Sequence, residues 1–259
     1  MNTGSLPLVA VDWAAPPGVK ALVTTRAGGV SAAPRDTLNL GNHVGDAEQA
    51  VAENRRRLRI GATLPAEPRW LSQVHGIAVA DLDALPVEEV PTADAALSTT
   101  RGTVCAVLTA DCLPVFLAAQ DGTAVAIAHA GWRGLAAGVV ESTVAALRRR
   151  AATGAQLVAW LGPAISAPHF EVGAEVRDAF LATDARAEAA FLRGREGHWY
   201  CDLYALARQR LAAVGITQAS GGTACTYADE ARFFSHRRDV QHRGLASTGR
   251  IASLIWMQA

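Results

Sequence analysis

The firmest structural signal in the sequence is a pair of apolar runs, "VFLAAQ" and "TAVAIAHA", separated by Asp121-Gly122. An Asp-Gly pair between two strands predicts a two-residue hairpin turn, which fixes the register of the strands. In that register Pro114 faces His129. Cys112 lies two residues beyond Pro114 on the same face, so it becomes a diagonal neighbour of His129 at roughly 7–8 Å. The hairpin therefore permits a site shared by a thiol and an imidazole.

Further apolar runs predict buried strands over residues 21–25, 103–109, 115–119, 123–130, 156–162 and 249–257. Helical spacing predicts helices over residues 46–59, 135–150, 171–182 and 202–214. Strands and helices alternate irregularly, so we expect a mixed α/β (α+β) fold in which mixed sheets are flanked by helices. We expect a single domain over residues 1–259, with residues 1–20 as an N-terminal lead-in.

Composition excludes several classes of function. The 259 residues include 24 basic and 24 acidic side chains, and this balance argues against a nucleic-acid partner. The sequence contains neither a basic, apolar leader nor a run of about 20 apolar residues, so we expect a soluble, cytoplasmic protein without a membrane partner. Four cysteines without a C-x-x-C pair suit a reducing cytosol. Lys20 is the only lysine, which leaves little room for Schiff-base or Walker-type chemistry.

Asp111 and Cys112 interrupt the apolar run "VLTADCLPVF". A carboxylate in such surroundings must be paired, hydrogen-bonded or protonated. The position of Asp111 therefore indicates a functional site. His75 in "WLSQVHG" and His129 in "AIAHAGWRG" likewise stand at the ends of apolar runs. Each residue also has a structural interpretation: His75 as an exposed loop residue, Cys112 as a small core residue and His129 as a buried, hydrogen-bonded histidine.

Polar loops supply candidates for binding an anion, of which phosphate is the natural one. "HAGWRG" predicts a tight strand-to-helix turn at which backbone N–H groups and Arg133 can receive an anion. Arg26 in "TTRAGGVS" stands beside two glycines, and Asn42 and His43 lie in "NLGNHVGD", although both loops also fit ordinary turn chemistry. Arg237 belongs to the cationic segment "FFSHRRDVQHRGLASTGR", which is either a solvated loop or the lining of an anionic pocket.

"QVHG", "TADC" and "HAGWRG" in this order, together with the loops above and "LGPAISAPHFEVGAEV", closely resemble the bacterial YfiH-like family, also called the polyphenol oxidase or laccase-domain family. The resemblance runs from about Thr24 to the C-terminus. It implies a compact fold similar to cysteine-hydrolase-like toxin catalytic domains, a monomer, and His75, Cys112 and His129 as metal ligands. His236 departs from the family pattern, which tends to place an aromatic residue after the serine of "FFS".

The resemblance also implies a function. Family members are zinc-dependent purine nucleoside enzymes that phosphorolyse adenosine, inosine, guanosine and methylthioadenosine and deaminate adenosine. Two imidazoles and one thiolate are the three protein ligands typical of a catalytic zinc with an open fourth position. Asp111 is then a candidate general base, or a partner that orients a metal-bound imidazole. We expect the catalytic residues to be His75, Asp111, Cys112 and His129, and the substrate or phosphate residues to be Arg26, Asn42, His43, Arg133 and Arg237.

Three other interpretations fit the same residues. Cysteine with two histidines is also the blue-copper ligand set, which would suit a copper-dependent polyphenol oxidase, although the seven histidines contain no His-x-His pair. Cys112 and His129 can instead serve as nucleophile and base of a metal-free cysteine hydrolase, with Asp111 or Asn42 as the orienting group. A zinc-stapled binding module would need a fourth protein ligand, for which Cys201 and Cys225 are the remaining candidates.

Overall fold

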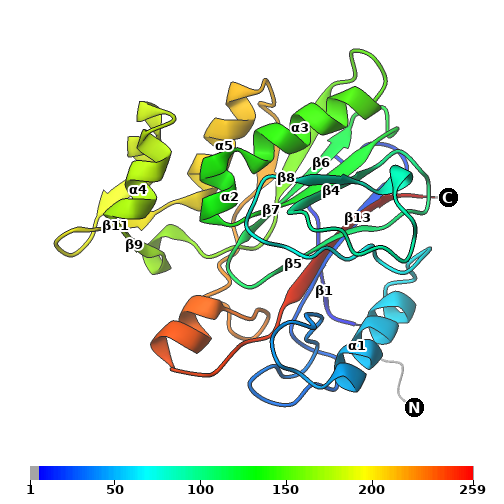
Figure 1. Cartoon of the computed structure of the whole chain (residues 1–259), viewed down its shortest axis with the longest axis horizontal. Helices are drawn as coiled ribbons and strands as arrows, with labels where there is room; N and C mark the ends of the chain where they lie inside the picture. Colours follow the sequence, from blue (N-terminus) through cyan, green and yellow to red (C-terminus); the bar gives the residue numbers. More distant parts are fainter. Residues whose placement is uncertain (1–5, 259) are drawn as a thin grey trace.

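The computed structural model describes residues 6–258 (Figure 1). Its strands are β1 (Leu8–Ala10), β2 (Val19–Thr24), β3 (Val79–Asp81), β4 (Ala95–Ser98), β5 (Cys105–Thr109), β6 (Leu113–Ala119), β7 (Val125–Ala130), β8 (Leu157–Leu161), β9 (Glu171–Gly173), β10 (Phe191–Arg193), β11 (His198–Cys201), β12 (Ala219–Gly221) and β13 (Ile251–Met257). Its α-helices are α1 (Glu48–Gly61), α2 (Trp132–Ala137), α3 (Val139–Arg150), α4 (Ala174–Leu181) and α5 (Leu203–Ala213). Short 3-10 helices are η1 (Leu82–Ala84), η2 (Ala167–His169) and η3 (Ala185–Ala190), and η4 (Arg237–His242) is a π-helical segment.

Two sheets lie face to face between helices. One sheet has the strand order β1-β2-β13-β5, and the other has the order β12-β8-β6-β7-β4-β3. Helices α2, α3 and α5 cover the outer face of the six-stranded sheet, whereas α1 packs on the outer face of the four-stranded sheet (Figure 1). This helix–sheet–sheet–helix arrangement confirms the expected mixed α/β class and single compact domain.

Alternation along the central strands explains how the layers pack. On β6, Val115 and Leu117 point into the core beneath the helices, whereas Phe116 points into the core between the two sheets. On β13, Ile255 faces the core between the sheets and Leu254 faces α1. Both strands are therefore buried on both faces, which is why they occur in the sequence as nearly continuous apolar runs.

The predicted hairpin is confirmed. Strands β6 and β7 pair antiparallel with Pro114 opposite His129, as the Asp121-Gly122 turn requires. In the turn, the N–H of Gly122 donates to the carbonyl of Ala119 at 2.9 Å. Of the expected lead-in, residues 1–5 lie outside the described part of the chain, and β1 adds an edge strand to the four-stranded sheet by pairing with β2.

Two predicted helices differ from the structure. The helix expected over residues 135–150 is interrupted at Gly138, whose φ of 102° is left-handed, and α2 already begins at Trp132. Glycine adopts this conformation without a steric penalty, so the chain turns there although the apolar spacing continues. The helix expected over residues 171–182 is wrong at its start, because Glu171–Gly173 forms β9 and pairs with β11. Helix α4 then begins at Ala174.

The connection Ala110–Cys112 joins the two sheets, because β5 belongs to the four-stranded sheet and β6 to the six-stranded one. Asp111 and Cys112 therefore stand between two strands and do not break a single strand. Leu113 is opposite Ala130, the last residue of β7, so the connection lies beside the start of α2. The fold thus brings Cys112 and His129 to one end of the sheet pair. Within the described residues, no helix is both long and apolar enough to cross a bilayer.

Candidate active site

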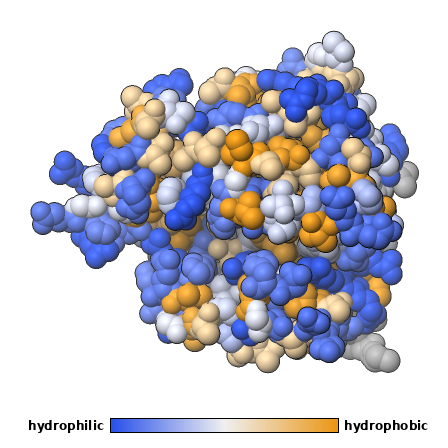
Figure 2. Space-filling model, viewed as in Figure 1, coloured by the Kyte–Doolittle hydropathy of each residue, from blue (hydrophilic) through white to orange (hydrophobic). Residues whose placement is uncertain are grey.

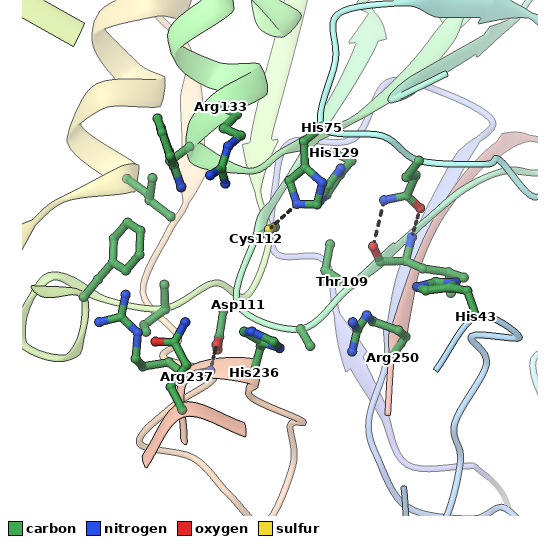
Figure 3. Close-up of a pocket in the computed structure, with 18 residues that line it drawn as sticks. His43, His75, Thr109, Asp111, Cys112, His129, Arg133, His236, Arg237 and Arg250 are labelled. Atoms are coloured by element: carbon green, nitrogen blue, oxygen red, sulfur yellow. Dashed lines mark hydrogen bonds between the residues drawn. The ribbon is translucent and has the colours of Figure 1, made fainter. Parts of the chain in front are cut away.

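A pocket of about 460 Å³ opens where β5 and β7 end and β6 begins. Its walls come from the loop that carries His75, the β5–β6 connection, the start of α2 and η4. Figure 2 shows the surface hollowed between the helical upper part of the molecule and its lower part, and Figure 3 shows the side chains that line the pocket. Its volume lies within the range of roughly 300–1,000 Å³ that is usual for small-molecule sites.

His75, Cys112 and His129 bring three ligand atoms together in this pocket. One such atom from each residue lies within 4.8 Å of the others. The Sγ atom of Cys112 is 3.7 Å from Nε2 of His75, and the two imidazole rings meet edge to face with centroids 4.7 Å apart. Among the described residues, this is the one group of three or more His, Cys, Asp or Glu side chains with such spacing.

Asp94, which the sequence analysis did not single out, holds two of the three ligands. Its fully buried carboxylate accepts a hydrogen bond from Nδ1 of His129 at 2.8 Å. It also accepts from the backbone N–H groups of Val74, His75 and Gly76 at 3.2, 2.9 and 2.6 Å. Because Nδ1 of His129 is engaged, Nε2 is the ring nitrogen left to face Cys112.

The signal for Asp94 was present in the sequence. Asp94 follows Thr92-Ala93 and precedes the apolar strand β4, just as Asp111 follows Thr109-Ala110 and precedes β6. The reasoning that predicts a role for an acid at the edge of an apolar run applies equally to both. Only the fold, however, shows which of the two acids contacts an imidazole.

The electrostatics of the cluster favour a charged thiolate. Burial raises the pKa of Cys112, but the nearby imidazoles of His129 and His75 outweigh burial and lower this pKa to about 6. For His129, burial acts in the opposite direction and lowers the pKa. The nearby Cys112 and then Asp94 outweigh burial and raise this pKa to about 9. At neutral pH the pair is therefore a thiolate beside an imidazolium. The thiolate is the form of cysteine that binds metals and acts as a nucleophile.

The backbone is shaped around the cluster. His75 and Asp111 have left-handed φ angles of 61° and 86°, a conformation that costs a non-glycine residue about 1–3 kcal/mol. Gly131 approaches closely: a Cβ atom there would lie 2.7 Å from Cδ2 of His75 and 3.0 Å from Sγ of Cys112. Glycine is therefore the residue that leaves room for both ligands.

Asp111 lines the pocket but has a different function from Asp94. Its carboxylate accepts hydrogen bonds from the hydroxyls of Thr226 and Ser235 at 2.7 and 3.0 Å and from the N–H of Arg237 at 2.7 Å. Within residues 6–258, no hydrogen bond joins Asp111 to His75 or His129. Of the two roles expected for Asp111, orienting an imidazole is thus performed by Asp94.

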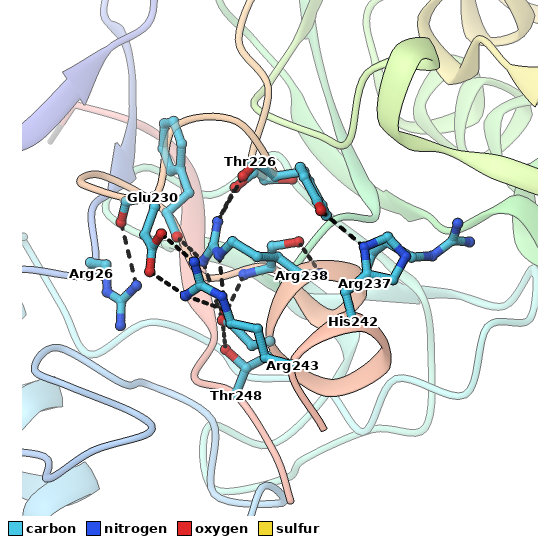
Figure 4. A network of polar contacts seen from close by, with 12 residues as sticks. Arg26, Thr226, Glu230, Arg237, Arg238, His242, Arg243 and Thr248 are labelled. Atoms are coloured by element: carbon cyan, nitrogen blue, oxygen red, sulfur yellow. Dashed lines mark hydrogen bonds and ion pairs between the residues drawn. The ribbon is translucent and has the colours of Figure 1, made fainter. Parts of the chain in front are cut away.

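A buried ion pair supports the segment that Asp111 binds. Arg238 and Asp239 are 2.8 Å apart, and their side chains are only 5% and 3% exposed. Arg238 also donates to the carbonyl of Thr226 at 2.9 Å, and Asp239 accepts from the hydroxyl of Thr248 at 2.6 Å (Figure 4). This network fixes η4, from which Arg237 reaches the pocket (Figure 3). Such π-helical segments are frequent at functional sites.

Three of the predicted substrate residues line the pocket: His43, Arg133 and Arg237. The guanidinium of Arg133 lies over the ring of Trp132, 4.3 Å from its centroid. Arg237 lies over the ring of Phe170 at 5.2 Å and donates to a main-chain carbonyl at 2.7 Å. Both arginines therefore stand beside aromatic walls.

The other two predicted substrate residues lie elsewhere. Arg26 pairs with Asp36 at 3.3 Å, and its guanidinium lies over the ring of Phe234 at 4.7 Å. Asn42 is exposed and does not line the pocket, although its neighbour His43 does. The positions of Arg26 and Asn42 therefore do not support their expected roles.

Other lining residues were not selected from the sequence. Polar ones are Gln73, Thr109, His236, Gln241 and Arg250, and apolar ones are Leu108, Ala110, Trp132, Ile165, Phe170 and Leu203. His236 and Arg250 belong to the cationic segment noted in the sequence, but nothing in that segment alone distinguishes them from its solvated arginines. The pocket thus combines a cluster that could hold a metal ion, an apolar wall and several cationic groups.

Comparison with known proteins agrees with this combination. A sequence model of the family described as multi-copper polyphenol oxidoreductase laccase matches residues 20–258. The chain belongs to this laccase-domain family. Two relatives cover nearly the whole chain: purine nucleoside phosphorylase YfiH of Escherichia coli is 52% identical over 250 residues, 96% of this chain and 98% of the relative. A purine nucleoside phosphorylase of Pseudomonas aeruginosa is 52% identical over 248 residues, 95% of this chain and 97% of the relative.

Solved structures of similar proteins have the same fold. A protein from Neisseria meningitidis superposes with a TM-score of 0.88 at 45% identity and covers 97% of this chain and 99% of its own. YlmD from Geobacillus stearothermophilus superposes with a TM-score of 0.82 at 29% identity and covers 94% of this chain and 93% of its own. The resemblance to the laccase-domain family that the motifs indicate is therefore confirmed.

Proposed function

We propose that this laccase-domain protein is a zinc-dependent purine nucleoside phosphorylase. Two relatives at 52% identity carry the name purine nucleoside phosphorylase. The observation that carries the proposal is the cluster of His75, Cys112 and His129 in a pocket that is also lined by arginines. The proposed substrates are adenosine, inosine, guanosine and methylthioadenosine with inorganic phosphate, and deamination of adenosine is the proposed second activity.

The geometry of the three donors fits zinc. With bonds of about 2.3 Å to sulfur and about 2.0 Å to nitrogen, two ligands of a tetrahedral zinc lie about 3.5 Å apart. The Sγ atom of Cys112 and Nε2 of His75 are 3.7 Å apart. Asp94 leaves Nε2 of His129 free for the third bond. A zinc ion bound by these residues would supply a Lewis acid with one open position.

In phosphorolysis, an oxygen of phosphate bonds to the anomeric carbon of the ribose, the bond from that carbon to the purine nitrogen breaks, and the purine takes up a proton. The wall formed by Ile165, Phe170 and Leu203 can hold the purine, and the pocket arginines can neutralise phosphate. Three hydrogen bonds already stabilise the carboxylate of Asp111. We therefore propose that Asp111 positions Cys112 and Arg237 and does not transfer a proton.

Product analysis tests the proposal directly. Adenosine is incubated with the protein with and without phosphate: adenine and ribose 1-phosphate report phosphorolysis, and inosine reports deamination. We expect Cys112→Ala and His75→Ala to abolish both phosphorolysis and zinc retention. Cys225→Ala is the matched control, because Cys225 is also a free, partly buried cysteine but lies outside the cluster. Phosphorolysis by Cys112→Ala at the wild-type rate would refute the mechanism.

A metal-free cysteine hydrolase is the second candidate, and one observation favours it. The thiolate of Cys112, the imidazole of His129 and the carboxylate of Asp94 follow one another in the order of a Cys-His-Asp triad. Asp94 here takes the orienting role for which Asp111 and Asn42 were considered. Treatment with a chelator separates the two functions, because a covalent cysteine enzyme retains its activity after metal removal and a zinc enzyme does not.

Copper-dependent oxidation of phenols is the alternative that the description of the family suggests. The ligand types of the cluster also suit copper. A multicopper oxidase, however, needs several sites, whereas residues 6–258 contain one cluster of this kind. Metal analysis of protein produced without added copper, together with a visible spectrum, decides: zinc in a colourless protein supports the phosphorylase, and a blue copper protein supports the oxidase.

We further propose that the protein acts as a monomer in the cytoplasm. All four cysteines are free thiols, which suits a reducing compartment. The pocket is formed by residues of one chain, so the proposed reaction requires no second subunit. Sedimentation analysis and cell fractionation test the two parts of this proposal separately.

A further inference from the structure

One corner of the pocket is formed by Arg250 and His43, which come from distant parts of the chain. The N–H of Arg250 donates to Oδ1 of Asn39 at 2.9 Å, and the carbonyl of Arg250 accepts from the N–H of Leu40 at 3.2 Å. A Cβ atom on Gly41 would lie 2.8 Å from Cγ of Arg250 and 3.4 Å from Cε1 of His43. The arginine stem and the imidazole therefore both lie against Gly41 and face the pocket from there (Figure 3).

Among residues 6–258, no carboxylate pairs with Arg250. Its Nη1 donates to the carbonyls of Thr248 and Gly249, both at 3.0 Å, and its other guanidinium nitrogens have no hydrogen-bond partner within the described residues. Arg26 and Arg238, by contrast, each form an ion pair with an aspartate. Carbonyl oxygens do not neutralise a partly buried cation, so an anion in the pocket would supply a contact that the chain itself lacks.

Thr109 adds an independent indication of a ligand. Its side chain is 1% exposed and lines the same pocket, and within residues 6–258 its Oγ1 has no hydrogen-bond partner. Buried hydroxyls almost always have a partner, and a molecule bound in the pocket can supply the partner that this hydroxyl lacks. The hydroxyl can donate to an oxygen of that molecule or accept from it.

Two imidazoles complete the corner. Partial desolvation in the pocket and then the charge of Arg250 lower the pKa of both His43 and His236. At neutral pH both rings are therefore uncharged, and each offers one N–H donor and one acceptor nitrogen. Partly protonated phosphate has acceptor oxygens and a hydroxyl, so it matches a corner with one fixed cation and several neutral donors.

We propose that inorganic phosphate binds in the corner formed by Arg250, His43, His236 and Thr109. The proposal rests on the phosphorylase function and assigns its second substrate to a corner in which His43 is the only residue expected from the sequence, whereas the expected Arg26, Arg133 and Arg237 lie outside it. The purine then lies on the opposite side of the pocket, where Arg133 and Arg237 stand over aromatic rings. Phosphate attacks the anomeric carbon from its corner, and the purine leaves on the other side.

Calorimetric titration of inorganic phosphate into the zinc-loaded protein, without nucleoside, tests the proposal. We expect Arg250→Gln to raise the dissociation constant for phosphate about tenfold to a hundredfold, the usual effect of losing hydrogen bonds to a charged group. His43→Ala raises it as well, and because His43 is exposed this variant keeps the core intact. Arg26→Gln, outside the pocket, leaves it unchanged. Weaker binding in Arg133→Gln with unchanged binding in Arg250→Gln and His43→Ala would overturn the assignment.

Parallel assays of adenosine cleavage separate this proposal from the function on which it rests. Phosphate-dependent cleavage by wild type, together with an unchanged phosphate affinity in Arg250→Gln and His43→Ala, refutes the corner and leaves the phosphorylase function intact. Phosphate binding that depends on Arg250, without cleavage of any nucleoside, supports the corner and refutes the phosphorylase function. Failure of wild type to bind phosphate refutes the corner.

Discussion

Nδ1 of His129 lies 2.8 Å from Oδ1 of Asp94, and the backbone N–H of His129 donates to the carbonyl of Asp94 at 2.7 Å. The end of β7 is thus joined to the residue before β4 through both side chain and main chain. Because the same carboxylate binds the N–H of His75, one buried acid sets the positions of two proposed metal ligands. The precision of the site therefore depends on a residue that does not itself bind the metal.

We expect Asp94→Asn to lower zinc affinity about tenfold to a hundredfold, because the amide cannot accept from three backbone N–H groups and an imidazole at once. Competition with a chromogenic chelator measures the affinity. Asp83→Asn is the matched control, since Asp83 is also a hydrogen-bonded aspartate with little exposure but does not line the pocket. Equal losses of zinc affinity in both variants would show that Asp94 has no special role.

Gly131→Ala tests the close approach of the backbone to the cluster. The added Cβ would lie 2.7 Å from Cδ2 of His75 and 3.0 Å from Sγ of Cys112, so at least one ligand must move. We expect zinc affinity to fall by more than tenfold, whereas stability falls by about 1–3 kcal/mol, as for other overpacked sites. Gly76→Ala is the control, because its nearest contact would be an ordinary 3.4 Å. Zinc affinity at the wild-type level in Gly131→Ala would contradict the prediction.

Asp83 predicts a pH-dependent contribution to stability. Burial raises the pKa of Asp83, but hydrogen bonds from Ser98 and Thr99 outweigh it and hold this pKa well below the usual value. A carboxylate with a lower pKa in the folded chain stabilises the fold above its unfolded pKa of about 4, and this contribution is lost as pH falls through the folded pKa. We expect Asp83→Asn to lower the free energy of unfolding by about 1–3 kcal/mol near neutral pH.

Urea unfolding near pH 7 and again near pH 3 measures this contribution. The difference between wild type and Asp83→Asn narrows at the lower pH, because the carboxylate takes up a proton in the unfolded chain while it stays ionised in the folded chain. Asp178→Asn serves as the control: its side chain is 66% exposed, and we expect a change within about 0.5 kcal/mol at either pH. A difference for Asp83→Asn that is the same at both pH values would argue against the lowered pKa.

Breaking the buried ion pair between Arg238 and Asp239 is expected to have a large effect on stability. We expect Asp239→Asn to lower the free energy of unfolding by about 3–5 kcal/mol, because it leaves the buried guanidinium of Arg238 without its counter-charge. Glu230→Gln is the control, because it breaks an exposed ion pair: the side chains of Glu230 and Arg243 are each 48% exposed. We expect it to lower the free energy of unfolding by at most about 1 kcal/mol. Urea unfolding compares the two variants. Similar losses of unfolding free energy in both would show that burial does not determine how much an ion pair contributes to stability.

Local signals in the sequence predicted the local structure well. Asp121-Gly122 determined the register of β6 and β7, and with it the proximity of Cys112 and His129, because a two-residue turn leaves no freedom in the pairing. Gly138 shows the limit of such signals. The apolar spacing continues through it, so periodicity predicts one helix where a left-handed glycine separates two.

Contacts between distant segments could not be predicted in this way. Arg250 is bound by Asn39, 211 residues earlier in the chain, and no periodicity or turn relates the two. Asp94 and Asp111 precede their strands in the same sequence context, yet only Asp94 meets an imidazole, because β4 pairs with β7. The sequence motifs predicted the three candidate metal ligands, whereas the residues that hold these side chains in place follow only from the pairing of strands.

The order of strand pairing also determines when the site can form. His75 precedes β3, Cys112 precedes β6 and His129 lies near the end of β7, so the three donors meet only after β7 has paired with both β4 and β6. A metal that requires all three donors cannot guide early folding and binds the nearly finished protein. We therefore expect zinc to slow unfolding while leaving the rate of folding almost unchanged.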